Sequence, residues 1–180
     1  MIYKEEIKIP KDRIPILIGK EGETKKLVER STKTKINIDS ETGDIVITSD
    51  ESINCFITKT IIKAIGRGFN PDIALTLLNE ENLFEVINIQ EFSKKSKKRL
   101  LNIKARIIGT KGKAKSMLEQ LTHTNICVYG KTVSIVGRIE NVMIAKHGIE
   151  SLLNGAPHGN VYRLIEDQLS PKNNLAWIPA

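Results

Sequence analysis

The chain has 180 residues, 40% of them hydrophobic and 27% charged, with a formal net charge of +7. This composition is typical of a protein with a buried core, and no apolar run approaches the roughly 18 residues that a membrane span needs. The N-terminus has no apolar signal-peptide core, and Cys55 and Cys127 belong to no CxxC pair or Cys/His cluster. We therefore expect a cytoplasmic protein with two reduced thiols and no membrane partner.

The first half of the chain carries strand, helix and turn signals in a regular order. Alternating apolar and polar residues predict strands, apolar residues at helical spacing predict helices, and glycine or proline marks the turns. The long helix of this half is expected to start at an Asp50 cap. Its buried stripe is expected to be Ile53, Phe56, Ile57, Thr60, Ile61, Ala64 and Ile65. In chain order, the expected elements are a strand over 2–9, a helical turn over 11–17, a Gly19–Gly22 turn, a helix over 23–30, strands over 34–38 and 45–47, and the long helix up to Gly66 and Gly68.

The second half repeats this order after a short connecting helix over 71–78. A tail over 156–180 is expected to contain one helical turn around 162–169 and to end in an irregular, proline-containing segment. In chain order, the expected elements are a strand over 84–89, a helix that follows the basic run 94–99, a Gly109–Gly112 turn, a helix over 113–121, strands over 125–129 and 132–136, and a long helix over 139–153.

The two halves read as copies of one module. Ile18-Gly19-Lys20-Glu21-Gly22 recurs 90 positions later as Ile108-Gly109-Thr110-Lys111-Gly112. Eight residues are identical over the 23 positions from Ile16 to Ile38, too many in one register for coincidence. After a hairpin that is one residue shorter, Gly66 aligns with Gly155. We therefore expect two domains, residues 1–80 with the connecting helix and residues 81–180 with the tail. Beyond the turns, the shared residues are Lys25/Lys115, Glu29/Glu119, Thr32/Thr122, Thr34/Thr124 and Ile36/Ile126.

A Gly-x-x-Gly turn between two helices lets one backbone approach another, and the helix that follows offers free N–H groups to an anion. One such turn is weak evidence, but two in the same context favour a module that grips a chain of phosphates. The turns lack the Lys-Ser/Thr ending of a nucleotide-binding P-loop, and no residue set has metal-ligand or catalytic spacing. We expect a nucleic-acid-binding protein that is not an enzyme and holds no metal or other cofactor. One alternative is an RNA-processing enzyme, which a metal-dependent cleavage assay would test.

The positive charge is concentrated in the second half. Residues 1–83 contain 13 Lys or Arg and 14 Asp or Glu, whereas residues 84–180 contain 15 and 7. The first turn, Lys20-Glu21, is neutral, whereas the second, Thr110-Lys111, is followed by further lysines. We expect the second turn to hold phosphates more strongly. The run 94–99, with five positive charges, is open to two interpretations, a solvated loop or a phosphate-contacting arm.

Each copy resembles a KH domain of the type I arrangement, by its glycine turn, the aliphatic residues before it and its order of elements. The resemblance implies an α+β fold of two tandem type I KH domains, each a three-stranded sheet packed against three helices. It also implies a groove that clamps about four unpaired nucleotides with their phosphates against the turn. Aromatic residues make up only 4% of the chain, so we expect an aliphatic groove floor rather than a stacking platform. The expected RNA-binding residues are Gly19, Lys20, Glu21, Gly22 and Lys25 in the first domain, Arg106, Ile108, Gly109, Thr110, Lys111, Gly112, Lys113, Lys115, Ile126 and Val128 in the second, and Ile18 and Ile36 as the first domain's floor.

The second half also resembles a particular family. Its segments Arg106-Ile107-Ile108-Gly109, Tyr129-Gly130-Lys131-Thr132-Val133 and Gly155-Ala156-Pro157-His158 are similar to those of the archaeal form of the Dim-two (partner-of-Nob-one) ribosome-assembly factors, and the similarity covers nearly the whole chain. This resemblance implies a cytoplasmic ribosome-biogenesis factor that binds the single-stranded 3′ region of small-subunit rRNA during rRNA processing. It also implies the maturation endonuclease and a translation initiation factor as protein partners.

The first domain leaves an alternative open. Eukaryotic members of that family lack the glycine turn in their first KH domain, whereas this chain keeps Gly19 and Gly22. The first domain can therefore be a second RNA clamp or a protein-docking module. In the latter case the chain is an interaction adaptor whose first KH domain docks a translation or maturation factor, with RNA binding secondary.

Overall fold

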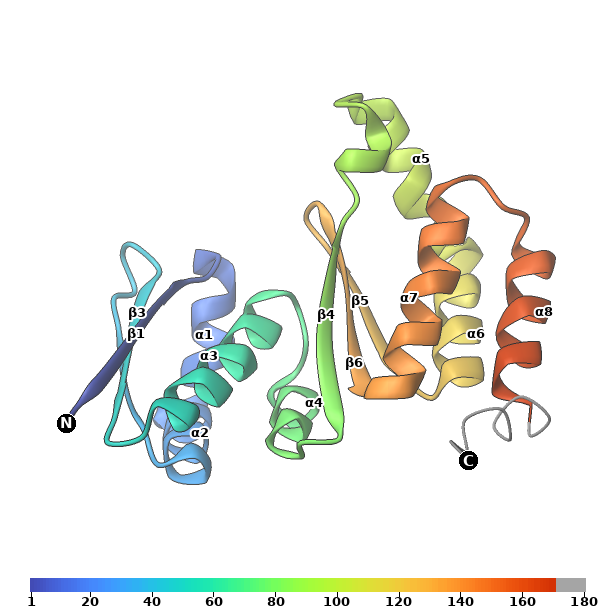
Figure 1. Ribbon diagram of the computed structural model, residues 1–180. Coiled ribbons are helices and arrows are strands. Elements are labelled where there is room, and N and C mark those ends of the chain that lie inside the picture. The colour runs from blue at the N-terminus through green and yellow to red at the C-terminus, as the bar shows by residue number, and fades with distance from the viewer. Residues whose placement is uncertain (171–180) are drawn as a thin grey trace, which may run out of the picture. The chain divides into compact units, whose positions relative to one another are not determined.

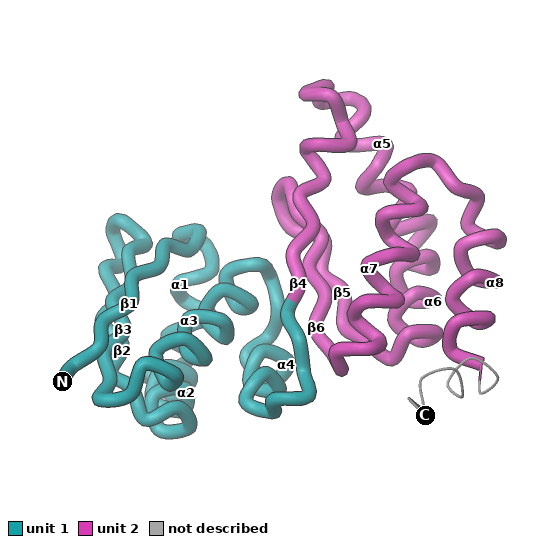
Figure 2. Tube along the Cα trace, in the orientation of Figure 1, with its two compact units in different colours: residues 1–84 teal, residues 85–180 magenta. Residues whose placement is uncertain are grey.

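The computed structural model describes residues 1–170, and the irregular end predicted for the tail lies outside them. The chain forms two compact units, Met1–Phe84 and Glu85–Ala180 (Figure 2). No helix within residues 1–170 has both the length and the apolar character needed to traverse a bilayer.

The first unit is a three-stranded antiparallel sheet with its helices on one face (Figure 1). The sheet order is β1-β3-β2, so β3 is central and β2 lies at an edge. Ile45 and Ile47 of β3 are fully buried and form the centre of the core. The order of elements is the predicted one, with short 3-10 turns around the glycine segment. The strands are β1 (Tyr3–Lys8), β2 (Lys35–Ile38) and β3 (Asp44–Ser49), and the helices are α1 (Ile14–Ile18), α2 (Glu23–Thr32) and α3 (Ser52–Gly66).

Helix α3 buries only part of the predicted stripe. Its N-cap is Glu51 rather than Asp50, and the side chains of Ile53 and Phe56 are 57% and 64% exposed. The buried stripe instead contains the polar residue Thr58, which is fully buried. Ile61, Ala64 and Ile65 are buried as predicted, but the first two turns of the helix bury Cys55 and Thr58 in place of Ile53 and Phe56. Thr58 avoids the cost of burial because its hydroxyl donates to the Asn54 carbonyl at 2.8 Å.

The second unit repeats the sheet in the order β4-β6-β5, with β5 again at an edge (Figure 1). The predicted connecting helix is present as α4 (Pro71–Leu75), continued by a 3-10 turn over Thr76–Leu78. The predicted α+β class with two KH-type repeats is confirmed. The strands are β4 (Asn82–Asn88), β5 (Asn125–Tyr129) and β6 (Thr132–Arg138), and the helices are α5 (Lys97–Ile108), α6 (Lys113–Thr122), α7 (Ile139–Leu153) and α8 (His158–Leu169).

Helix α8 has no counterpart in the first copy and is longer than predicted. The sequence indicated one turn around 162–169, but the helix has 12 residues and follows directly after Pro157. It packs on α6 and α7, and its Val161 and Ile165 are buried. A Cβ atom on Gly148 of α7 would lie 2.8 Å from Ile165 Cδ1, so α8 approaches α7 closely at that glycine. The predicted turn was too short because the local pattern does not show that the whole helix packs on α6 and α7.

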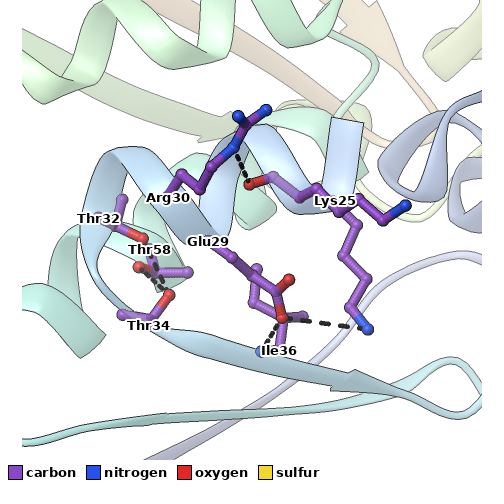
Figure 3. A network of polar contacts seen from close by, with 8 residues as sticks. Lys25, Glu29, Arg30, Thr32, Thr34, Ile36 and Thr58 are labelled. Atoms are coloured by element: carbon purple, nitrogen blue, oxygen red, sulfur yellow. Dashed lines mark hydrogen bonds and ion pairs between the residues drawn. The ribbon is translucent and has the colours of Figure 1, made fainter. Parts of the chain in front are cut away.

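The threonines shared by the two copies are part of the scaffold. Thr32 Oγ1 donates to the Val28 carbonyl at 2.8 Å and lies 2.9 Å from Thr34 Oγ1, which in turn lies 3.2 Å from Thr58 Oγ1 (Figure 3). The second copy repeats the first two contacts at Thr122 and Thr124, at 2.7 and 2.8 Å. These buried hydroxyls tie the end of the second helix to the start of the edge strand in each unit.

We expect Thr34→Val to lower the stability of the first unit by about 1 kcal/mol, because it removes a buried hydroxyl partner while keeping the side-chain shape. Hydrogen exchange of the β3 amides measures this unit separately from the second. The control is Thr60→Val, which removes a solvent-facing bond to the Phe56 carbonyl and should change stability by less than about 0.5 kcal/mol. Equal effects of the two substitutions would contradict a scaffold role for the buried threonines.

Candidate nucleic-acid interface

The two glycine turns have nearly the same backbone conformation. Gly19 and Gly109 have φ/ψ of 72/179° and 73/176°, a region open only to glycine. Gly22 and Gly112 are left-handed, with φ of 78° and 75°. Both predicted turns therefore exist, each between the two helices that the sequence indicated.

The first position of each turn requires glycine for two reasons, its backbone conformation and the lack of room for a side chain. A Cβ atom on Gly19 would lie 2.8 Å from the Thr24 backbone nitrogen, and one on Gly109 would lie 2.7 Å from the Ala114 nitrogen. The turn backbone thus packs against the first turn of the next helix. By contrast, a Cβ atom on Gly112 would meet nothing within 4 Å, so the outer side of the turn is open to a ligand.

Between the glycines, each turn holds a non-glycine residue in the left-handed region. Glu21 has φ 52° and Lys111 has φ 53°, and both side chains are exposed. This conformation costs an L-residue on the order of 1 kcal/mol. Because it occurs in both copies with unlike side chains, the fold imposes it and the side chain does not.

Each turn leads directly into a helix N-terminus. Helices α2 and α6 begin one residue after the second glycine, and neither has a side-chain cap hydrogen bond at this end. The first N–H groups of a helix lack intrahelical partners and carry a partial positive charge, so they favour an anion such as a phosphate.

The edge strand beside each turn presents backbone groups outward. Ile36 N–H donates to Glu29 Oε1 at 2.7 Å, and Ile126 N–H donates to Glu119 Oε1 at 2.8 Å, so both point away from the central strand. Backbone groups two residues apart face the same side of a strand, so Val128 also directs its N–H and C=O to this edge. An unpaired nucleobase can form hydrogen bonds there.

Two of the predicted phosphate ligands are engaged with these glutamates. Lys25 Nζ lies 4.0 Å from Glu29 Oε1, and Lys115 Nζ lies 3.2 Å from Glu119 Oε1 (Figure 3 shows the first pair). Each lysine therefore offsets the charge of the carboxylate that holds the edge strand. The exposed lysines of the turns are instead Lys20 in the first unit and Lys111 and Lys113 in the second.

The aliphatic floor is divided between surface and core. Ile18, Ile108 and Val128 are half-buried, whereas Ile36 and Ile126 are 3% and 2% exposed. The two buried isoleucines support the floor from beneath and do not offer surface to a ligand in this conformation. The sequence predicted all five as floor residues because an aliphatic side chain in a sequence can belong to the core or to a groove.

A cavity of about 350 Å³ lies beside the first turn. Its lining includes residues that the sequence did not indicate, because they converge from separate segments. One wall is the β2–β3 loop, which is held by Asp39 Oδ1 accepting from the backbone N–H groups of Glu41 and Thr42 at 2.8 and 3.1 Å. These hydrogen bonds lower the pKa of Asp39. The lining residues are Lys11, Ile14, Pro15, Ile18, Gly19 and Ser40.

In the second unit, Arg106 and the basic run 94–99 both make hydrogen bonds within the protein. Arg106 Nη2 donates to the Ala156 carbonyl at 2.7 Å, so its guanidinium is bound within the protein. The run 94–99 forms a turn and the start of α5: Lys94 and Lys95 are left-handed, and Ser96 Oγ caps the helix by accepting from Arg99 N–H at 3.3 Å. Its lysines are exposed, and a phosphate-contacting role for them stays a prediction.

This geometry, two glycine turns each beside an open strand edge in sheets of order 1-3-2, defines a tandem type I KH-domain protein. Residues 4–63 match the KH domain model, and residues 83–170 match the model described as eukaryotic type KH-domain, KH-domain type I. The chain belongs to the archaeal Dim2 (PNO1) family of KH-domain proteins.

Two relatives, one matched over most of its length and one over less than half, are similar to this chain. A KH domain-containing protein of Methanocaldococcus jannaschii is 42% identical over 165 residues, covering 90% of this chain and 72% of that protein. The pre-rRNA-processing protein PNO1 of Chaetomium thermophilum is 36% identical over 107 residues, covering 56% of this chain. The chain spans only 40% of the length of that fungal relative.

Solved structures match along nearly the whole chain. Dim2p from Pyrococcus horikoshii OT3 has 46% identity and a TM-score of 0.84, covering 92% of this chain and 99% of that one. A chain of the a/eIF2alpha–aDim2p–rRNA complex from the same organism has 45% identity and a TM-score of 0.85, with 93% and 94% covered.

The two glycines of the second turn should respond differently to alanine. Gly112→Ala adds a side chain in open space. It should lower the free energy of unfolding of the second unit by about 1–2 kcal/mol, because alanine disfavours the left-handed conformation. Gly109→Ala also adds a clash with the Ala114 backbone, so it should lower this free energy of unfolding by at least about 3 kcal/mol. Hydrogen exchange of the β6 amides compares them, and equal losses would contradict the close contact between turn and helix.

Proposed function

We propose that the chain is an RNA-binding ribosome-assembly factor that binds the single-stranded 3′ region of small-subunit rRNA during pre-rRNA maturation. The observation that carries the proposal is the second turn, where an open helix N-terminus, exposed lysines and an outward-facing strand edge lie together. Support comes also from the relatives, since one is named a pre-rRNA-processing protein and another was crystallised in a complex with rRNA.

In the proposed complex, the backbone amides at the start of α6 hold one or two phosphates, with Lys111 and Lys113 beside them. The bases then turn toward β5, where Val128 offers its backbone groups and Ile108 its aliphatic surface. Phosphate contacts position the strand, and contacts to base edges select its sequence. A paired strand cannot bind in this way, because its base edges are already occupied.

The second domain carries most of the proposed affinity. The turn residues of the first domain are neutral in sum, and Glu21 would repel a phosphate, whereas Thr110-Lys111 would not. Gly19, Lys20 and Gly22 are proposed as a weaker clamp, supported by the cavity beside Gly19.

The proposed role needs binding only. The chain would hold the rRNA end in an accessible, unpaired form and leave cleavage to a maturation endonuclease, with a translation factor of the kind present in the Dim2p complex as a second protein partner. Among residues 1–170, no three His, Cys, Asp or Glu side chains are grouped so that they could hold a metal ion.

A matched pair of variants tests the division between the domains. Thr110→Asp with Lys111→Asp, and Lys20→Asp with Glu21→Asp, convert both turns to Gly-Asp-Asp-Gly. Aspartate tolerates the left-handed conformation, so both variants should fold. The second-domain variant should weaken single-stranded RNA binding by at least about tenfold and the first-domain variant by less than about threefold. A filter-binding assay in which the first-domain variant loses more would reverse the assignment.

The target is tested with RNA of the chain's own organism. We expect an unpaired strand carrying the 3′-terminal small-subunit rRNA sequence to bind about tenfold more tightly than a scrambled strand of equal length and composition. Phosphate contacts cancel in this comparison, and a few base-edge hydrogen bonds worth about 1 kcal/mol each remain. Annealing a complementary strand should abolish binding. Equal affinity for native and scrambled strands would leave an RNA-binding protein without a ribosomal target.

A further inference from the structure

The C-terminal ends of α3 and α7 are closed by the same backbone motif. After α3, Phe69 N–H donates to the Ala64 carbonyl at 3.2 Å, next to left-handed Gly68. After α7, Ala156 N–H donates to the Ser151 carbonyl at 3.0 Å, next to left-handed Gly155. Both are Schellman caps, so Gly68 and Gly155 are structural equivalents. The predicted alignment of Gly155 with Gly66 was wrong by two residues.

In both units, an arginine binds the carbonyl of the residue that completes this cap. Arg13 Nη2 donates to the Phe69 carbonyl at 2.9 Å, while its Nε donates to Ile65 at 2.8 Å. Arg106 Nη2 donates to the equivalent Ala156 carbonyl at 2.7 Å. The carbonyl position is the same but the arginine is not, because Arg13 lies six residues before its turn glycine and Arg106 only three.

In the second unit, the backbone of Arg106 is also hydrogen-bonded to the segment that starts α8. His158 Nε2 lies 2.8 Å from the Arg106 carbonyl oxygen, and because a carbonyl only accepts, Nε2 carries the proton. The Ala105 carbonyl next to it accepts from Gly109 N–H at 2.8 Å, so Arg106 belongs to the last turn of α5, where carbonyls lack helical partners. Side chain and backbone of Arg106 are thus both bound to the segment that starts α8.

From these contacts we propose that Arg106 and His158 are positioning residues for RNA binding. Together with Ala156 they form a clasp that fixes the last turn of α5, from which the turn glycine Gly109 follows directly, and so orients the amides that receive the phosphate. Arg106 does not contact RNA in this arrangement. The guanidinium is half-buried and its Nε is buried without a partner among residues 1–170, so it does not project toward a ligand. This inference rests on the proposed RNA-binding function of the second domain.

Affinity and its salt dependence together separate positioning from contact. Wild-type protein that neutralises about four to six phosphates should show a log–log salt slope of roughly −3 to −4 for single-stranded RNA. Arg106→Gln should weaken binding by about tenfold at an unchanged slope, because no phosphate contact is lost. A direct phosphate ligand would instead reduce the slope by roughly 0.7 to 1.

His158 tests the same clasp without changing charge on α5. His158→Ala should weaken RNA binding in the same way, whereas His158→Gln should retain most of the affinity, because the glutamine amide can still donate to the Arg106 carbonyl. This pair also keeps the test decisive if Arg106→Gln does not fold. The matched control is Arg13→Gln, which breaks the equivalent bond in the first unit and should leave RNA affinity within about twofold of wild type.

The outcomes are distinct. Wild-type affinity in both Arg106→Gln and His158→Ala overturns the clasp, as does a reduced salt slope in Arg106→Gln. Failure of the proposed function shows differently, because the wild-type protein and the Gly-Asp-Asp-Gly variant of the second turn would then bind single-stranded RNA equally weakly.

Discussion

The first glycine of each turn lies so close to the helix after it that no side chain fits between them. This contact of Gly19 with Thr24, and of Gly109 with Ala114, fixes where the following helix begins. The helix N-terminus then lies at the outer side of the turn, and the second helix carries the glutamate that reaches the edge strand. The open helix N-terminus and the outward-facing strand edge are therefore held at a set separation by one steric constraint.

The sequence predicts the features that depend on local pattern or on the repeat. The order of elements, the tandem fold and both glycine turns follow from periodicity and from residues shared at one offset. The errors arise where the partner of a side chain is not evident from the sequence pattern, whether that partner lies four residues away or fifty. Thr58 in a buried stripe, Arg106 bound to Ala156 and Lys115 bound to Glu119 each look like something else until the acceptor is known. Helix α8 belongs to the same group, since its stability depends on packing against α7.

Comparison of the two copies separates the residues that hold each unit together from those that differ at the proposed ligand surface. The residues identical in both copies, such as Glu29/Glu119 and Thr34/Thr124, make buried or strand-edge hydrogen bonds in both units. The copies differ in turn charge and in the presence of α8. The carbonyl of the residue that completes the cap after the third helix accepts from an arginine in both units. The donor is Arg13 in the first unit and Arg106, at a different position relative to the glycine turn, in the second. The unsatisfied acceptor is the constraint, and the position of its donor is free to vary.

The left-handed residue inside each turn extends this argument to function. Glycine would adopt φ near 50° without the cost of about 1 kcal/mol that Glu21 and Lys111 bear. The fold therefore gains nothing from a side chain at this position, in either copy. What differs is the field that each side chain projects beside an open helix N-terminus, negative at Glu21 and positive at Lys111. A cost in stability without a structural return is expected where the side chain acts on a ligand, and only the positive one assists a phosphate. The strain is the same in both copies and does not distinguish them, whereas the sign of the side chain's charge does, and this local difference supports the proposal that the second turn binds the phosphate.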